Sequence, residues 1–287
     1  MKPQDLKTKI FLDSGDPKET REIISLLGFL DGQTTNPTLI SKNPEAAARL
    51  EKGEKFTSEE ILDFYKEVVE EISSLIPKGS VSVEVYADSN TTAEEMEEQG
   101  KNMFSWIDNA HIKLPITEAG LKVAQSFISE GIRVNMTLCF SQEQAAGVYA
   151  ATKGASKGDV FVSPFIGRLD DRGENGISFI QNTLDMYGNG DGHVEVLTAS
   201  VRSYEHFLAA LAINSDIITA PAKTLREWAE KGMTVPDADY EYDKGELKDF
   251  ILEDLDLNME WNKFDLKHEL TVKGIERFAS DWNSLIQ

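Results

Sequence analysis

Short β-branched runs alternate with helix-like stretches along most of this chain, and that alternation constrains its fold more than any other feature. The eight runs lie at residues 9–13, 32–36, 81–85, 111–115, 133–139, 160–165, 194–200 and 216–221. Helix starts between them carry capping residues, such as Asp16 before Pro17 and Thr57 three residues before Glu60. Strands that alternate with helices in this way are typical of parallel sheets built from βαβ units.

The eight units are not interrupted by a composition break or a Pro/Gly-rich linker, which favours one domain over two doubly wound ones. The 287 residues also suit a (β/α)8 barrel, which typically has about 250. We therefore predict the α/β class and a single TIM-barrel domain over residues 1–287, with its core at about 9–235 and an acidic C-terminal extension at 236–287 that ends in a helix. We expect the stretch 41–56 to be irregular and to carry a small insertion.

The net charge of the chain limits the classes of binding partner that we expect. Asp and Glu number 50 against 29 Lys and Arg, giving a net charge of −21. Such a surface repels nucleic acid and anionic lipid unless the few cations gather at one place, so we expect neither partner. No apolar run reaches the length of a membrane span or a signal peptide, and the single Cys139 cannot form an internal disulfide. We therefore expect a cytoplasmic protein.

Lys113 is the sharpest single observation, because it stands between Ile112 and Leu114 in a strand that we expect to be buried. An ammonium in such a place loses hydration, which favours the neutral amine. A neutral amine can attack a carbonyl and form a Schiff base, which acts as an electron sink for cleavage of an adjacent carbon–carbon bond. The alternative is a lysine whose stem crosses apolar surface while its head lies in water or pairs with a carboxylate.

Other polar side chains lie at the carboxyl ends of the predicted strands, where the chemistry of a barrel is located. Asp13 and Glu84 supply two carboxylates, which could handle protons or could simply neutralise Lys113. Arg168 and Arg202 could form an anion site, although a lone Arg after a strand is more often a surface residue. The remaining polar candidates are Thr34, Asn36, Asn135, Thr137, Ser163 and Ser200.

Several stretches of the chain together resemble one family. They include IFLDSGD, DGQTTNPTLI, HIKLPITEAGL, GIRVNMTLCFSQEQA, VSPFIGRLDD, LTASVRS and, more loosely, VKGIERFASDW. With the order and spacing of TTNPT and KLPITEAGL, the chain resembles the transaldolases, a family that includes the smaller fructose-6-phosphate aldolases. The resemblance implies a (β/α)8 barrel of the class I aldolase type, acting on sugar phosphates without a cofactor.

The resemblance also implies a role for each candidate residue. Lys113 would form the Schiff base, Asp13 would act as general acid and base, and Glu84 with Thr137 would hold the water used in Schiff-base chemistry. Thr34, Asn36 and Ser163 would bind the dihydroxyacetone part of the substrate. Arg168 and Arg202, helped by Asn135 and Ser200, would hold the phosphate. The four histidines show no metal-ligand spacing, so we expect no metal site.

Two positions separate group transfer from simple cleavage. The small aldolases that the chain resembles typically carry Gln where Glu84 stands and Tyr where Phe165 stands. We therefore expect a transaldolase, which converts sedoheptulose 7-phosphate and glyceraldehyde 3-phosphate to erythrose 4-phosphate and fructose 6-phosphate in the pentose phosphate pathway. The alternatives are a fructose-6-phosphate aldolase-type lyase and a non-catalytic barrel that binds sugar phosphates. Dimers and larger rings occur in the family, so the resemblance leaves a homo-oligomer open.

Overall fold

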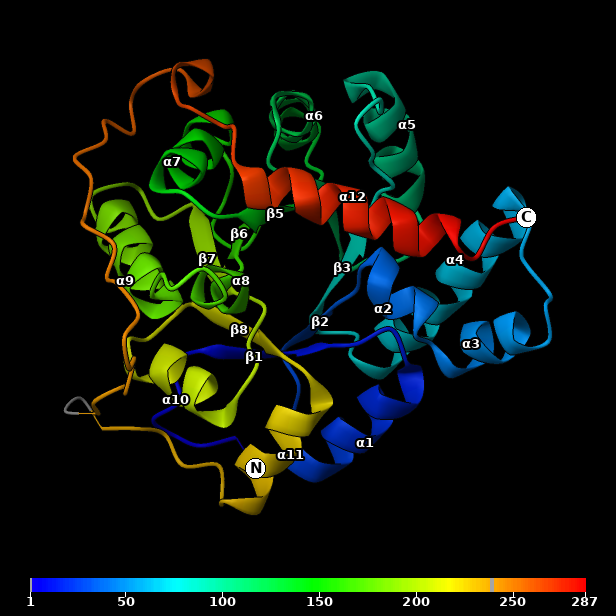
Figure 1. The fold of residues 1–287 in the computed structure, drawn as a ribbon, viewed down its shortest axis with the longest axis horizontal. Helices are drawn as coiled ribbons and strands as arrows, with labels where there is room; N and C mark the ends of the chain where they lie inside the picture. The colour runs from blue at the N-terminus through cyan, green and yellow to red at the C-terminus, as the bar shows by residue number, and fades with distance from the viewer. Residues whose placement is uncertain (1, 238–239) are drawn as a thin grey trace.

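The computed structural model describes residues 2–237 and 240–287, and eight parallel strands close into a barrel in chain order (Figure 1). The strands are β1 (Lys9–Asp13), β2 (Gly32–Thr34), β3 (Ser80–Glu84), β4 (Ala110–Pro115), β5 (Val134–Cys139), β6 (Val160–Pro164), β7 (Val194–Thr198) and β8 (Ile217–Ala220). Each pairs with the next, and β8 pairs with β1. The predicted (β/α)8 barrel is confirmed.

Helices surround the barrel, and the last of them crosses one of its ends (Figure 1). They are α1 (Pro17–Leu27), α2 (Pro37–Ser41), α3 (Pro44–Glu51), α4 (Ser58–Leu75), α5 (Ala93–Phe104), α6 (Glu118–Ser129), α7 (Gln142–Ala151), α8 (Ile166–Asp170), α9 (Gly176–Tyr187), α10 (Tyr204–Ala212), α11 (Ala222–Glu230), the 3-10 helix η1 (Trp261–Lys263) and α12 (Glu269–Asn283).

Local sequence explains where the elements near β2 begin and end. The run predicted at 32–36 stops at Thr34, because the Asn36 side chain accepts a hydrogen bond from the Leu39 amide and so caps α2. The expectation that 41–56 is irregular is wrong for its middle, where α3 forms. Asn43 caps α3 and Pro44 occupies its first turn, a pairing that favours a helix start.

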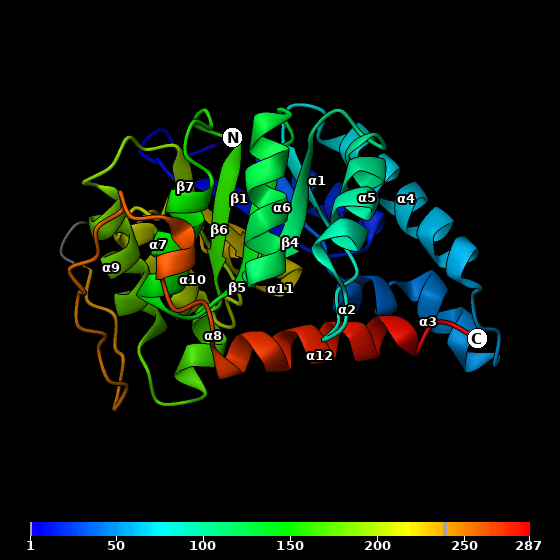
Figure 2. The same cartoon turned by 90° about the horizontal axis from the view of Figure 1, so that it is seen from above.

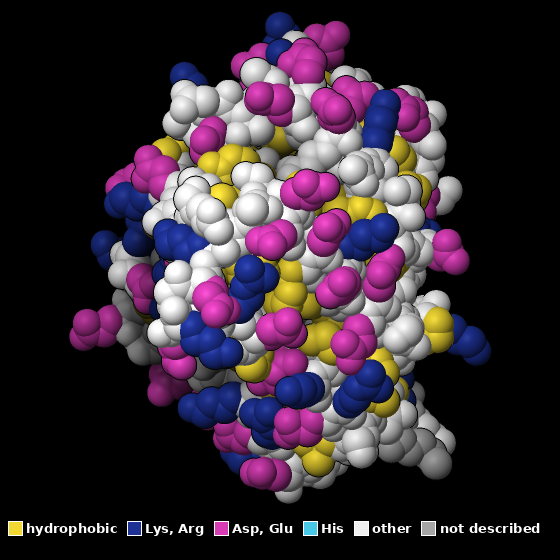
Figure 3. Space-filling model, turned by 90° about the vertical axis from the view of Figure 1, so that its right-hand side faces the viewer, with side chains coloured by type: hydrophobic (Ala, Val, Ile, Leu, Met, Phe, Trp, Pro, Cys, Tyr) yellow, Lys and Arg dark blue, Asp and Glu magenta, His cyan; other side chains and the backbone are white. Residues whose placement is uncertain are grey.

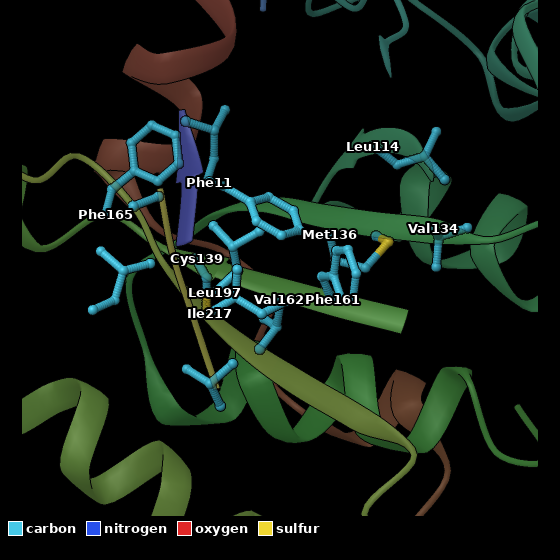
Figure 4. Close-up of a cluster of buried hydrophobic side chains, with 14 of the residues drawn as sticks. Phe11, Leu114, Val134, Met136, Cys139, Phe161, Val162, Phe165, Leu197 and Ile217 are labelled. Carbon is cyan, nitrogen blue, oxygen red and sulfur yellow. The ribbon is translucent and has the colours of Figure 1, made fainter. Parts of the chain in front are cut away.

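The strands bury apolar residues on both sides of the barrel wall. Inside, Phe11 and Phe161 meet edge to face with their ring centroids 6.0 Å apart (Figure 4). A Cβ at Gly32 would lie 2.5 Å from the Phe11 ring, so only glycine leaves that ring its place. The outward-facing side chains are fully buried against the helices and include Ile10, Leu12, Ile112, Leu114, Val134, Met136, Val160 and Val162. Each contributes roughly 1.5–3 kcal/mol on burial.

The C-terminal helix α12 lies across the carboxyl end of the barrel (Figure 2). The Thr271 hydroxyl donates to the Leu138 carbonyl at 2.9 Å, and Gly274 lets the helix pack closely on the Leu138 side chain. Leu138 sits at an irregularity of β5 and has a φ of 63°. The sequence predicted a terminal helix, and the structure confirms it and shows that it covers the end of the barrel where active sites of this fold lie.

The outer surface mixes both signs of charge. Acidic and basic side chains are interspersed on the face shown in Figure 3. Within residues 2–237 and 240–287, no helix combines the length and the apolarity that crossing a membrane requires.

Candidate active site

Lys113 lies on the inner face of β4 with its side chain only 3% exposed. Its amine is 2.9 Å from Glu84 Oε2 on the neighbouring strand β3 and donates to the Thr35 carbonyl at 3.3 Å. The Phe165 and Phe278 rings lie 6.0 and 5.9 Å from the same nitrogen. The lysine head is therefore inside the protein, paired with a carboxylate and walled by two aromatic rings.

Two carboxylates interact electrostatically with this amine. Burial raises the pKa of Asp13 above its usual value, although the charge of Lys113 and a 2.6 Å hydrogen bond from Thr34 oppose the shift. Burial also raises the pKa of Glu84, against the attraction of Lys113. A carboxyl with a raised pKa is a stronger base than an ordinary aspartate or glutamate, which suits proton transfer near neutral pH.

Two buried oxygens on the strands that flank β4 have unused hydrogen-bonding capacity. Across the described residues, Glu84 Oε2 and Thr137 Oγ1 complete no hydrogen bond, although Glu84 Oε2 has its ion-pair contact with Lys113. Buried polar atoms are nearly always bonded to protein or to water. Each of these two oxygens therefore suits a water molecule or a hydroxyl of a bound substrate as its partner.

A pocket of about 240 Å³ opens above the lysine. Nine of the twelve residues singled out in the sequence line it: Asp13, Thr34, Asn36, Lys113, Ser163, Phe165, Arg168, Ser200 and Arg202. They come from the ends or following loops of β1, β2, β4, β6 and β7, which the closed barrel brings to one edge. Glu84 and Asn135 pair with Lys113 across the strands, and Thr137 pairs with Ser163, so these three residues lie on the barrel wall beside residues that line the pocket.

Asn135 forms hydrogen bonds inside the barrel wall. It is fully buried, and its amide donates to Ser82 at 3.0 Å while its oxygen accepts from Ser163 at 2.6 Å. Both ends of the amide are therefore occupied within the barrel. Asn135 therefore orients the hydroxyl of Ser163, which lines the pocket.

Both arginines of the predicted anion site line the pocket, but in the part of the chain that the structure describes only one of them already has a charged partner. Arg168 is half-buried and makes no ion pair or hydrogen bond through its side chain within the described residues, and burial together with the charges of Arg277 and Arg202 lowers its pKa. Arg202 forms a two-pronged ion pair with Asp171, with one contact at 2.7 Å. Gly167 makes room for it, because a Cβ there would lie 2.5 Å from Arg202 Nε.

Sequence reasoning missed several residues of the site. Tyr65 on α4 holds the two residues that contact the Lys113 amine. Its hydroxyl contacts Thr35 Oγ1 at 2.6 Å and accepts a hydrogen bond from the Glu84 backbone amide at 2.9 Å. In the sequence, Tyr65 occupies an ordinary core position of an amphipathic helix, so no local motif distinguishes it from other buried residues. The other missed residues that line the pocket include Lys42, Thr219, Arg277 and Phe278. Arg277 and Phe278 lie within VKGIERFASDW, so the looser match there was an available signal.

The fold and the pocket define a (β/α)8-barrel protein with a lysine at the centre of a pocket at the carboxyl ends of its strands. The family model described as Transaldolase/Fructose-6-phosphate aldolase matches residues 10–287. A probable transaldolase of Brucella melitensis biotype 1 is 38% identical over 274 residues, covering 96% of both chains. A probable transaldolase of Caulobacter sp. strain K31 is 35% identical over 274 residues, covering 96% of both chains. A probable transaldolase of Dehalococcoides mccartyi is 32% identical over 277 residues, covering 96% of this chain and 99% of the relative. The chain belongs to the transaldolase/fructose-6-phosphate aldolase family and is a transaldolase-type enzyme.

Proposed function

We propose that this enzyme transfers a dihydroxyacetone unit from a ketose phosphate to an aldehyde acceptor through a Schiff base on Lys113. The observation that carries the proposal is the position of the Lys113 amine, buried at the base of a pocket, 2.9 Å from Glu84 and influenced by the charge of Asp13. The substrates are sedoheptulose 7-phosphate with glyceraldehyde 3-phosphate, and the products are erythrose 4-phosphate with fructose 6-phosphate.

The reaction begins with attack of the neutral amine on the ketose carbonyl. The carbinolamine that forms loses water and becomes a protonated Schiff base. Asp13 then takes the proton of the hydroxyl on the carbon two positions from the former carbonyl carbon. The bond between that carbon and the carbon next to the former carbonyl carbon breaks. Its electron pair moves to the Schiff-base nitrogen, leaving an enamine, while an aldose phosphate departs. Addition of the enamine to the acceptor aldehyde and hydrolysis reverse these steps and free the lysine.

Water must leave and return at the nitrogen of Lys113, and two residues support that exchange. Glu84 Oε2 and Thr137 Oγ1 face the barrel interior on either side of β4 and complete no hydrogen bond across the described residues. A water held between them would satisfy both oxygens. The raised pKa of Glu84 favours its acting as a base on that water and as an acid in the reverse direction.

The phosphate is assigned to Arg168 and Arg202. The Arg168 guanidinium has an unused set of donors, and a guanidinium fork matches phosphate oxygens in a bidentate way. Arg202 keeps donors beyond those that it gives Asp171. In a chain of net charge −21, these cations make the pocket mouth the favourable place for a sugar phosphate.

Phe165 supports transfer rather than cleavage. Its ring lies 6.0 Å from the lysine nitrogen and offers no hydroxyl through which a proton could reach the enamine. The enamine therefore waits for an acceptor aldehyde instead of being protonated and released as free dihydroxyacetone.

Acceptor dependence tests the proposal. Fructose 6-phosphate alone should give almost no glyceraldehyde 3-phosphate beyond one equivalent per enzyme. Adding erythrose 4-phosphate should start steady turnover and produce sedoheptulose 7-phosphate. Steady release of dihydroxyacetone from fructose 6-phosphate without any acceptor would instead identify a lyase.

A further inference from the structure

The C-terminal helix α12 contributes a charged residue to the pocket. Arg277 and Phe278 line it together with Arg168 and Arg202. The helix is fixed over the barrel because Thr38 on α2 donates a hydrogen bond to Asp281. Its position across the carboxyl end is visible in Figure 2. Arg277 is therefore held at the mouth by an element outside the eight βα units.

The balance of charge in the pocket is the reverse of that in the whole chain. Among the described residues, the cations that line it are Lys42, Lys113, Arg168, Arg202 and Arg277, and Asp13 is the one acid. The chain as a whole has 50 acidic residues against 29 Lys and Arg. Like charges gathered in this way repel one another, and the charges of Arg277 and Arg202 lower the pKa of Arg168. An anion bound among them would offset that repulsion.

The Arg277 guanidinium has donors left for such an anion beyond its contact with Asp281. Its nearest carboxylate, Asp281, lies 3.8 Å from Nε, and the Arg277 side chain is 60% exposed. Gly274, one turn earlier on α12, shows which face of the helix meets the site, because a Cβ there would lie 3.3 Å from Arg168 Nη1. Residues three apart share a helix face, so Arg277 extends from the face that passes beside Arg168.

We propose that Arg277 is a third ligand of the substrate phosphate, and that α12 thereby sets the preference of the enzyme for phosphorylated over unphosphorylated sugars. The inference rests on the proposed function, since it concerns the same pocket. It adds a binding residue from the C-terminal extension to the two arginines that follow β6 and β7. Loss of Arg277 should weaken phosphate binding and leave the Schiff-base chemistry on Lys113 intact.

The test compares two donors that differ only in the phosphate. Fructose 6-phosphate and fructose are each supplied with erythrose as a constant, unphosphorylated acceptor, and sedoheptulose is measured. Arg277→Gln should lower kcat/KM for fructose 6-phosphate by roughly tenfold, the lower end for a charge-assisted hydrogen bond because the side chain is partly exposed. The loss should appear mainly in KM, while kcat/KM for fructose should stay within about twofold of the wild-type value.

Two further variants separate phosphate binding from other effects. Arg277→Lys should recover part of the loss, because it keeps the charge without the bidentate fork. Lys273→Gln removes a cation from the same helix that does not line the pocket and pairs instead with Glu269, so it should change neither donor. Equal losses with both donors, or an unchanged ratio of the two kcat/KM values in Arg277→Gln, would overturn the inference.

A trapping control keeps this result separate from the proposed function. Dihydroxyacetone carries no phosphate, so borohydride should trap it on Lys113 equally well in the wild type and in Arg277→Gln. If the wild type gives no adduct, the proposed Schiff-base function fails, and this inference fails with it. If both proteins give the adduct and Arg277→Gln still does not change the donor preference, only the assignment of Arg277 is wrong.

Discussion

Removing one partner of the Lys113–Glu84 ion pair should destabilise the protein more than removing both. The two side chains are 3% and 4% exposed, and their charged atoms lie 2.9 Å apart. At an effective dielectric constant of about 20, this separation gives roughly 6 kcal/mol of attraction. Desolvation of the two ions consumes several kcal/mol each, so the net contribution of the intact pair is near zero.

The single variants should therefore each lose about 3–5 kcal/mol of unfolding free energy, because one buried charge is left without its partner. The double variant Lys113→Met with Glu84→Leu should fall within about 1 kcal/mol of the wild type. In Lys113→Met the unpaired group is Glu84, whose pKa is already raised. A carboxyl with a raised folded-state pKa destabilises most when ionised, so this loss should shrink as the pH falls.

Urea unfolding at pH 7 and pH 5.5 measures these free energies. The control is the exposed pair Lys273–Glu269 on α12, with side chains 61% and 60% exposed, where Lys273→Gln and Glu269→Gln should each change stability by less than about 0.5 kcal/mol. The reasoning is refuted if each buried single variant stays within about 1 kcal/mol of the wild type at pH 7, or if the double variant loses the sum of the two single losses.

Three further changes follow from the geometry of the site. Asp13→Asn should reduce transfer at least about 100-fold and still raise the melting temperature at pH 7, because the raised pKa of Asp13 means that its ionised form disfavours folding. The gain in melting temperature should vanish as the pH falls toward 3.8. A lower melting temperature at pH 7 would contradict this account. Gly167→Ala should lower the free energy of unfolding in urea by about 1–3 kcal/mol and raise KM for fructose 6-phosphate, because the new Cβ would lie 2.5 Å from Arg202 Nε and the Ser200 carbonyl oxygen. An unchanged free energy of unfolding and KM would show that this contact relaxes freely. Phe165→Tyr should release dihydroxyacetone from fructose 6-phosphate without an acceptor in a coupled assay, because it places a hydroxyl near the enamine, and continued acceptor dependence would argue against that role for Phe165.

The eight strands could be predicted because their signal is local. Each is a short β-branched run bounded by turn or capping residues, and the two-residue period of a strand determines which side chains share a face. The sequence left open that a carboxylate of Asp13 or Glu84 neutralises Lys113, and strands β3 and β4 pair Glu84 with Lys113 directly. The helix α3 was missed although Asn43 and Pro44 carry its start signal and its three alanines favour a helix.

The rest of the site depends on side-chain contacts and on how α12 packs against the barrel, and the two-residue period of a strand does not encode either. The strand pattern does not show that the Asn135 amide is bonded to Ser82 and Ser163. Nor does a pattern show that Arg202 pairs with Asp171. Arg277 belongs to a helix about 50 residues beyond β8, and tertiary contacts, such as those with Leu138 and Thr38, decide which end of the barrel that helix covers.

The central claim is that Lys113 is the residue that bonds covalently to the substrate, and reductive trapping tests it most directly. The enzyme is incubated with fructose 6-phosphate, reduced with borohydride and mapped by peptide mass spectrometry. The account predicts one reduced dihydroxyacetone adduct, on the peptide that contains Lys113, and none in Lys113→Met. An adduct on Lys42, the other lysine that lines the pocket, or no adduct on any lysine would contradict it.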